Sequence, residues 1–154
     1  MEMNMKQWAA DYLAETKKKP LPVLSFPAIQ MMDITVKELI SSSDLQAKGM
    51  KLVADRVDAA AAVSLMDLSL EAECFGSTIR FSDDEVPTVI GSVVSTEEDA
   101  DALKVPEIGA GRTAIYIEAI EKAVKLIEDR PVLAGVIGPF SLAGRLMDVS
   151  EAMI

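Results

Sequence analysis

The chain has no histidine among its 154 residues, and this absence excludes several kinds of catalytic site. Histidine is the side chain whose ordinary pKa lies near neutrality, so the chain lacks the usual proton carrier at pH 7. Neither a Ser-His-Asp site nor a histidine-ligated zinc can be built from this sequence. Catalysis by this chain alone would depend on carboxylates, arginine, tyrosine or cysteine.

Cysteine, aromatic residues and long apolar runs are also scarce. Cys74 is the single cysteine, which excludes an intrachain disulfide and agrees with a reducing cytoplasm, the location we expect. No apolar run approaches the roughly 18 residues of a membrane span, and residues 1–16 lack the pattern of a secretory signal. Only 5% of residues are aromatic although 50% are hydrophobic. Such an aliphatic interior favours helices packed on buried parallel strands.

Acidic side chains outnumber basic ones by 25 to 15, which gives a net charge of −10. Because an acidic chain repels phosphate backbones, we expect no nucleic-acid partner. The dense basic cluster, Lys17–Lys19, suits the C-terminus of a helix better than an anion site.

Apolar runs alternate with amphipathic segments along the chain. The runs Ala59–Leu65 and Val132–Ile137 predict strands buried on both faces, and Leu21–Phe26 predicts a shorter first strand. Helices are predicted where apolar residues recur at intervals of three and four, over residues 5–17, 44–57 and 113–129. This alternation is typical of parallel β/α units.

Shorter signals predict the connecting elements. Asp33 or Thr35 could cap a short helix over Val36–Ile40, and Ser43 has the capping-box spacing to the glutamine three residues later. Residues 78–81 and 86–93 predict a hairpin, and acidic residues after Thr96 predict the start of a helix.

These elements predict an α/β fold with two parts: a helical extension over residues 1–20 and a partial (β/α) TIM-type barrel over residues 21–154. About three β/α units can be counted, whereas a closed eight-stranded barrel needs roughly 250 residues. The last residues carry no helix-ending signal. The sequence therefore predicts a truncated barrel.

Two segments resemble a known family. Ala60–Gly76 (AAAVSLMDLSLEAECFG) resembles the second-strand motif of uroporphyrinogen decarboxylases, and its portion Asp67–Glu73 resembles the methylcobamide methyltransferases of the same superfamily. Val132–Met147 (VLAGVIGPFSLAGRLM) resembles the next strand with its Gly-Pro-aromatic-Ser/Thr-Leu loop. From about residue 22 the chain is similar to the N-terminal portion of this superfamily, most of all to its corrinoid methyltransferase branch.

A departure from the family pattern favours that branch. Decarboxylases of the family carry an Arg-Gln-Ala-Gly-Arg segment after the first strand, whose arginines hold the carboxylates of the substrate. The corresponding stretch here, Phe26–Met32, has no arginine. A tetrapyrrole with many carboxylates would lack its main counter-charges, so decarboxylation is disfavoured.

The resemblance also implies cofactors and partners. In the methyltransferase branch the methyl group comes from a corrinoid on a partner protein and passes to a thiol such as coenzyme M, or to tetrahydrofolate. A zinc ion held by a His-x-Cys pair and a later cysteine activates the thiol. With no histidine and one cysteine, this chain is expected to hold no metal.

Asp67 and Glu71 are the candidate catalytic residues. Asp67 follows a buried strand, where barrel enzymes place active-site groups, and the resemblance implies that it faces the corrinoid or tetrapyrrole. It could instead cap a helix over residues 68–75. Together with Asp67 and Glu73, Glu71 forms a cluster of three carboxylates that could move protons or could lie in a solvated loop. We expect Cys74 to be a small buried residue rather than a nucleophile.

The loop Gly138, Pro139, Phe140 and Ser141 is the candidate cofactor-binding segment. Glycine and proline allow backbone to approach a ligand closely, and first-turn N–H groups with the serine hydroxyl could bind it. Ser141 could equally be the N-cap of the next helix. The Gly109–Arg112 segment lacks the strand, helix and Lys-Ser/Thr context of a phosphate loop.

We therefore expect part of a corrinoid methyltransferase that is inactive as this fragment. An alternative is a non-catalytic interaction protein, because a partial barrel exposes apolar strand edges that invite self-association or a completing chain. A third possibility is a relative of uroporphyrinogen decarboxylase.

Overall fold

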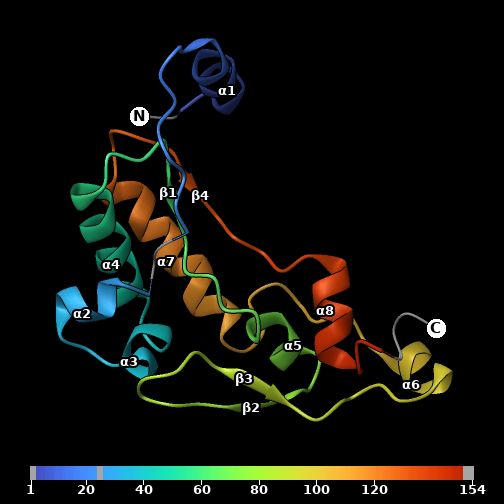
Figure 1. Cartoon of the computed structure of the whole chain (residues 1–154). Coiled ribbons are helices and arrows are strands. Elements are labelled where there is room, and N and C mark those ends of the chain that lie inside the picture. Colours follow the sequence, from blue (N-terminus) through green and yellow to red (C-terminus); the bar gives the residue numbers. More distant parts are fainter. Residues whose placement is uncertain (1–2, 24–25, 151–154) are drawn as a thin grey trace.

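The computed structural model describes residues 3–23 and 26–150. The elements follow in the order α1 (Met5–Ala14), α2 (Ala28–Met32), α3 (Val36–Ile40), α4 (Ser43–Arg56), β1 (Ala62–Val63), α5 (Leu70–Cys74), β2 (Thr78–Arg80), β3 (Thr88–Ile90), α6 (Glu97–Ala102), α7 (Thr113–Leu126), β4 (Val132–Leu133) and α8 (Pro139–Leu146) (Figure 1). Within the described ranges, no helix is both long and apolar enough to cross a membrane.

Strands β1 and β4 pair in parallel, with Ala62 opposite Val132 and Val63 opposite Leu133. The chain between them passes through α5, β2, β3 and α6, and helix α7 then leads it back to pair in parallel as β4. The predicted parallel β/α arrangement is confirmed. The regular strands are shorter than the predicted runs 59–65 and 132–137, although most of the alanines before β1 are buried.

Helices α4 and α7 lie side by side along the strand pair (Figure 1). Their contact is built from small residues, with Ala47 and Ala54 of α4 meeting Ala123 of α7 in one buried cluster. The apolar stripe that predicted α7 is not its buried face, because Ile117 and Val124 are 41% and 54% exposed. The helices approach on their alanine face, where short side chains let the two backbones come close.

A second core cluster joins α3 to the first residues after β1. Val36, Leu39 and Ile40 pack with Leu65 and Tyr116. Helix α3 begins with a capping box between Thr35 and Glu38, so of the two predicted caps Thr35 is the one observed. The cap matters because it fixes the start of a helix that packs against Leu65 and Tyr116.

The β2–β3 hairpin and helix α6 are confirmed. Thr78 lies opposite Ile90 in an antiparallel pair, and the chain of this hairpin runs along the edge of the molecule below α3 and α5 (Figure 1). The backbone N–H of Val36 donates to the carbonyl of Asp83 at 2.8 Å, which ties the hairpin turn to α3. A capping box between Thr96 and Asp99 begins α6.

The N-terminal region differs from the expectation. Helix α1 ends at Ala14, has no buried residue and stands away from the other helices (Figure 1). The predicted strand 21–26 is absent where it is described, since residues 21–23 are irregular and Phe26 lies in a turn; residues 24 and 25 lie outside the described ranges. Prolines at positions 20, 22 and 27 remove the backbone donors that a strand ladder needs. Lys18 donates to the carbonyls of Tyr12 and Leu13, so this lysine does lie at the helix C-terminus.

Two predicted helix starts are shifted. Ser42 rather than Ser43 is the N-cap of α4, and its hydroxyl accepts from the N–H of Leu45. Helix α8 begins at Pro139 with Gly138 as N-cap, so the expectation that Ser141 caps it is wrong. Proline suits the first helical position because its missing N–H would have no partner there. The sequence also predicts a helix over residues 149–154, of which residues 151–154 lie outside the described ranges.

Candidate functional site

A cavity of about 380 Å³ lies beyond the carboxyl ends of β1 and β4. Its walls come from residues 64–67 after β1, residues 134–137 after β4, helix α5, the loop 105–109 and the first turns of α7. Most of the wall is apolar, with Leu65, Ile117 and Ile120 among its residues. Ligands of parallel α/β folds bind at this end of the strands, so the cavity is the candidate site.

Asp67 lies in the wall of this cavity with only 1% of its side chain exposed. Its Oδ1 accepts hydrogen bonds from the N–H of Ser69 at 2.9 Å and the hydroxyl of Ser69 at 2.6 Å. Its Oδ2 accepts from Arg112 at 2.7 Å and from Tyr116 Oη at 2.9 Å. Four donors therefore hold the carboxylate. Of the predicted capping role, the structure shows the hydrogen bond from the N–H of Ser69, the residue just before α5.

Arg112 links two carboxylates of the predicted cluster. Its Nη1 donates to Asp67 and its Nε donates to Glu73 Oε2 at 2.5 Å, while the guanidinium lies 5.0 Å from the ring centre of Phe81. Burial lowers the pKa of Arg112, but the hydrogen bonds and charges of Asp67 and Glu73 outweigh it and raise the pKa overall. The arginine is therefore permanently charged and already neutralised by its two partners.

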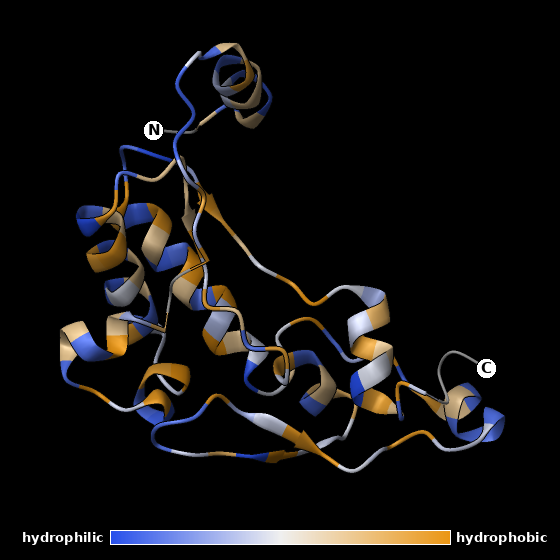
Figure 2. Cartoon of the chain, viewed as in Figure 1, coloured by the Kyte–Doolittle hydropathy of each residue, from blue (hydrophilic) through white to orange (hydrophobic). Residues whose placement is uncertain are grey.

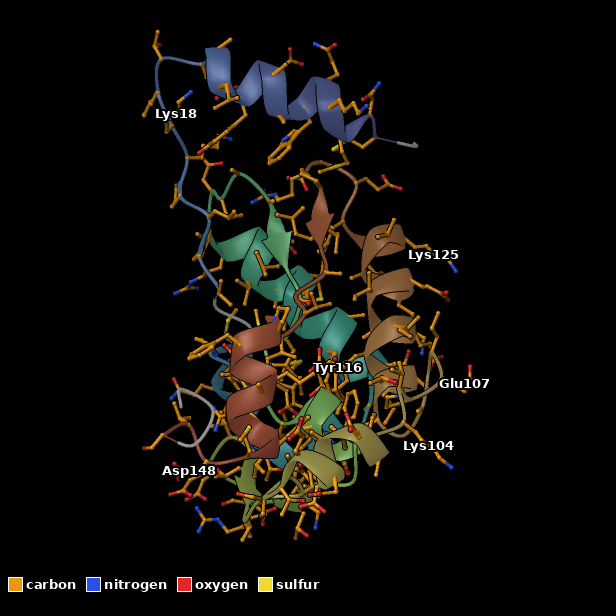
Figure 3. All side chains as sticks on the ribbon, turned by 90° about the vertical axis from the view of Figure 1, so that its right-hand side faces the viewer. Lys18, Lys104, Glu107, Tyr116, Lys125 and Asp148 are labelled. Atoms are coloured by element: carbon orange, nitrogen blue, oxygen red, sulfur yellow. The ribbon has the colours of Figure 1, made fainter. Side chains whose placement is uncertain are left out.

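Tyr116 completes the network from one turn further along α7. It lies in the middle of the molecule, whereas Lys104, Glu107 and Lys125 lie at its edge (Figure 3). Burial and the neighbouring Asp67 carboxylate raise the pKa of Tyr116 far above its ordinary value. The phenol therefore stays protonated at physiological pH and donates its proton to Asp67.

Glu71 and Glu73 have different surroundings. Glu71 lines the cavity, and its Oε1 accepts the backbone N–H of Ile137 at 3.2 Å. Glu73 is paired with Arg112 and is absent from the cavity wall. Asp67 and Glu71, the two predicted catalytic residues, therefore meet at one cavity.

The predicted loop Gly138–Ser141 lies beside this cavity and not in its described wall. The wall ends at Ile137, and the next residues form the first turn of α8. Phe140 is 65% exposed and Ser141 is also exposed. The predicted segment follows β4, as the cavity wall does, but the residues that line the cavity are those just before the Gly-Pro pair.

Comparison with known proteins identifies the family at this point. Residues 22–153 match the uroporphyrinogen decarboxylase (URO-D) family, which covers most of the chain. The chain belongs to the URO-D family. This match includes both segments whose residues meet at the cavity.

Curated relatives of this URO-D family chain are methyltransferases by name. The present chain is 39% identical over 79 residues to the methylcobamide:CoM methyltransferase MtbA of Methanosarcina acetivorans. The alignment covers 50% of this chain and 23% of the relative. The MtbA of Methanosarcina mazei is 40% identical over 83 residues, with the same shares covered. The alignments thus span under a quarter of these relatives.

A solved structure shares the fold. It is a methyltransferase from Methanosarcina mazei, with a TM-score of 0.77 and 21% sequence identity. The match covers 96% of this chain and 46% of that protein, so the chain spans about half its length. The likeness establishes the fold of the described α/β elements.

Arg112 and Tyr116 were not recognised as site residues from the sequence of this URO-D family chain. The sequence pattern singles out Arg112 only as the end of a weak Gly-rich motif. A local signal was available, because Arg112 and Tyr116 are four residues apart at the start of α7 and so share one face. That signal does not name Asp67 as the partner, which is 45 residues from Arg112.

Cys74 behaves as the sequence predicts. It is partly buried in the cavity wall, and its Sγ donates to the carbonyl of Ala110 at 3.2 Å. Burial, followed by the charge of Glu73, raises the pKa of this thiol. It is therefore a poor nucleophile at neutral pH.

The charged side chains that line the cavity are carboxylates, although Arg112 lies behind the wall and pairs with Asp67. The described wall of the cavity holds the carboxylates of Asp67, Glu71 and Glu107 and contains neither lysine nor arginine. An apolar wall with carboxylates opposes the burial of an anionic ligand and suits an uncharged or cationic one.

The zinc that the family resemblance implies does not fit the donors of this chain. Within the described residues no group of three histidine, cysteine, aspartate or glutamate side chains is arranged to hold a metal ion. The sequence has no histidine and one cysteine, so it cannot supply the His-x-Cys pair and later cysteine that the resemblance implies.

Proposed function

We propose that this chain forms the corrinoid-facing part of a methyltransferase that moves a methyl group from a corrinoid protein to a thiol such as coenzyme M, or to tetrahydrofolate. The observation that carries the proposal is the cavity at the strand ends, whose described wall is apolar and has carboxylates but no basic side chain. The family match and the names of the two curated relatives support the same branch.

The electrostatics argue against decarboxylation of a porphyrinogen. That substrate carries many carboxylates, which require arginines as counter-charges. Arg112, which lies behind the cavity wall, already pairs with Asp67 and Glu73, so its charge is not available to a substrate carboxylate. A corrin ring is surrounded by uncharged amide side chains, and it would meet no such repulsion.

The residues would act mainly by shape and by excluding water. We propose that Asp67 and Glu71 line the mouth facing the corrinoid and that Phe140, exposed beside the cavity, contacts the corrinoid or the protein that carries it. The methyl group is brought by the corrinoid of the partner protein. This chain would hold that group in a dry, apolar setting in which competing reaction with water is suppressed.

We further propose that residues 21–154 correspond to about the first three β/α units of a TIM-type barrel, with residues 1–20 as an extension. The fold match to 46% of a longer methyltransferase supports this arrangement. The zinc ligands of the whole enzyme would then come from sequence outside these 154 residues.

The test is methyl transfer by the natural protein that contains this sequence. With methylcobalamin as donor and coenzyme M as acceptor, Asp67→Asn should lower kcat/KM by about 100-fold, the cost of misplacing a positioned group, because the contact with Arg112 that holds this wall is weakened. Asp58→Asn is the matched control, because Asp58 is 77% exposed and pairs with Lys19 far from the cavity. Equal rates for parent and Asp67→Asn would remove Asp67 from the site.

A second candidate function is a non-catalytic interaction protein. It is favoured by exposed apolar side chains on one continuous region, notably Val136 at 75% and Phe140 at 65%. Figure 2 shows the same hydrophobic character along β4 and the chain that follows it. Light scattering tests this function: a dimer or larger assembly that becomes monomeric in Val136→Ser would support self-association, and a monomeric parent would contradict it.

A further inference from the structure

Where β1 and β4 reach the cavity, the acceptors of the hydrogen bonds between their segments change from backbone carbonyls to side chains. Two regular ladder bonds run from Ala62 N–H to the carbonyl of Pro131 and from Ser64 N–H to the carbonyl of Leu133, each 2.9 Å long. Further along, side chains replace the backbone as acceptors. The N–H of Gly135 donates to Ser64 Oγ at 2.8 Å.

The next amide on the same side of the chain follows this pattern. The N–H of Ile137 donates to Glu71 Oε1 at 3.2 Å. Glu71 belongs to helix α5, so the segment after β4 is fastened to a helix instead of to the neighbouring strand. Regular pairing of the strands ends at Val63 and Leu133. Beyond it the segments 64–67 and 134–137 diverge, and both line the cavity.

Packing beside Gly135 agrees with this divergence. A Cβ at Gly135 would lie 3.0 Å from Met66 Cε and 3.4 Å from Ser64 Oγ. The Met66 side chain therefore occupies the space next to Gly135 into which a Cβ would project. Glycine at this position lets the segment 134–137 pass Met66 without closing onto it.

We propose that Glu71 is a positioning residue whose carboxylate holds the amide of Ile137 and so fixes the segment 134–138 as one wall of the cavity. Ile137 directly precedes Gly138, the N-cap of α8, so the same bond sets where α8 begins. The role requires an acceptor oxygen and not a transferable proton. The inference rests on the proposed function only in assigning the cavity to a methyltransferase site.

Glutamine separates this role from proton transfer. Glu71→Gln keeps an acceptor oxygen at the same distance from the backbone but cannot carry a proton, whereas Glu71→Ala removes the acceptor. Glu121→Ala on the exposed face of α7 is a control for the loss of one carboxylate. Ser64→Ala is a second control, because it removes the acceptor of Gly135 and leaves that of Ile137.

The measurement is amide hydrogen exchange of the 154-residue chain, followed residue by residue by NMR. Glu71→Ala should speed exchange at Ile137 by about 10-fold, the equivalent of one lost hydrogen bond, with Gly135 less affected. Glu71→Gln should restore protection to within about 3-fold of the parent, and Ser64→Ala should act mainly on Gly135. Unchanged exchange at Ile137 in Glu71→Ala, or no rescue by glutamine, would overturn the proposal.

A measurement on the unmutated chain covers the case in which Glu71→Ala does not fold. The Ile137 amide of the parent chain should exchange about 10-fold more slowly than an amide without a hydrogen bond, and Glu71→Gln should keep most of this protection. Exchange of the Ile137 amide at the rate of an unstructured peptide would overturn the proposal. Neither measurement involves a corrinoid, so failure of the proposed function would leave both results intact.

Discussion

Removal of Arg112 is the sharpest test of how the site is held together. Arg112→Met keeps most of the length of the side chain but leaves Asp67 without its cation. The side chain of Asp67 is 1% exposed, and that of Arg112 is 13% exposed. A buried carboxylate without its partner destabilises the folded state, because water cannot reach the carboxylate to solvate it in place of the lost cation.

The magnitude follows from the contacts. Breaking a buried ion pair costs about 3–5 kcal/mol. Asp67 would keep three donors, from the N–H and hydroxyl of Ser69 and from Tyr116, so the lower end applies. Glu73 is 30% exposed and can regain water, so its loss should add less than about 1 kcal/mol. We therefore expect unfolding free energy to fall by about 3 kcal/mol.

Urea denaturation followed by circular dichroism measures this loss. With an m-value of about 2 kcal/mol per M, the midpoint should fall by about 1.5 M. Lys51→Met is the matched control, because its pair with Asp55 on α4 is exposed and should change the free energy by less than about 1 kcal/mol. The double variant Arg112→Met with Asp67→Asn should recover more than half of the loss.

Two results would refute the reasoning. The first is an Arg112→Met protein within about 1 kcal/mol of the parent, which would mean that water reaches Asp67. The second is a double variant no more stable than Arg112→Met, which would mean that the cost is lost packing and not an unpaired charge.

Three further predictions concern single side chains. Tyr116→Phe removes one donor to a buried carboxylate and should cost about 1.5–3 kcal/mol in urea unfolding; an unchanged midpoint would contradict the hydrogen bond. Because burial raises the pKa of Cys74, iodoacetamide should alkylate the folded chain more slowly than the chain in urea at pH 8; equal alkylation rates would contradict this prediction. For the same reason the free energy of unfolding should fall as pH rises through the raised pKa of the thiol. Leu39→Ala, at a residue 1% exposed, should cost about 2–5 kcal/mol, whereas Leu13→Ala, at a residue 76% exposed, should change stability by less than about 0.5 kcal/mol.

Much of the element order could be predicted because its signals are local. Periodicity placed α4 and α7, and the acidic residues after Thr96 placed the start of α6. Prolines explain the failure at residues 21–23, since the apolar run suggested a strand but the missing backbone donors oppose one. In α7 the isoleucine stripe indicated a helix, yet the alanines form its buried face because α4 approaches closely.

The site was predictable only in part for a related reason. Asp67 and Glu71 could be found because they follow a buried strand in the sequence. Their partners could not, since Arg112 and Ile137 are 45 and 66 residues away and are brought to the site by the parallel crossover and by β4. Sequence spacing gives residues that share a face of one element, whereas pairs between elements depend on tertiary packing.

The most direct test of the central claim is a comparison of two ligands on the 154-residue chain. Methylcobalamin and uroporphyrin, the oxidised form of the decarboxylase substrate with its carboxylates intact, are titrated separately and followed by absorbance. The account predicts that methylcobalamin binds at least about tenfold more tightly, a difference of about 1.4 kcal/mol, because the cavity wall has carboxylates and no basic side chain. Tighter binding of uroporphyrin, or no binding of methylcobalamin, would contradict the assignment of this cavity to a corrinoid.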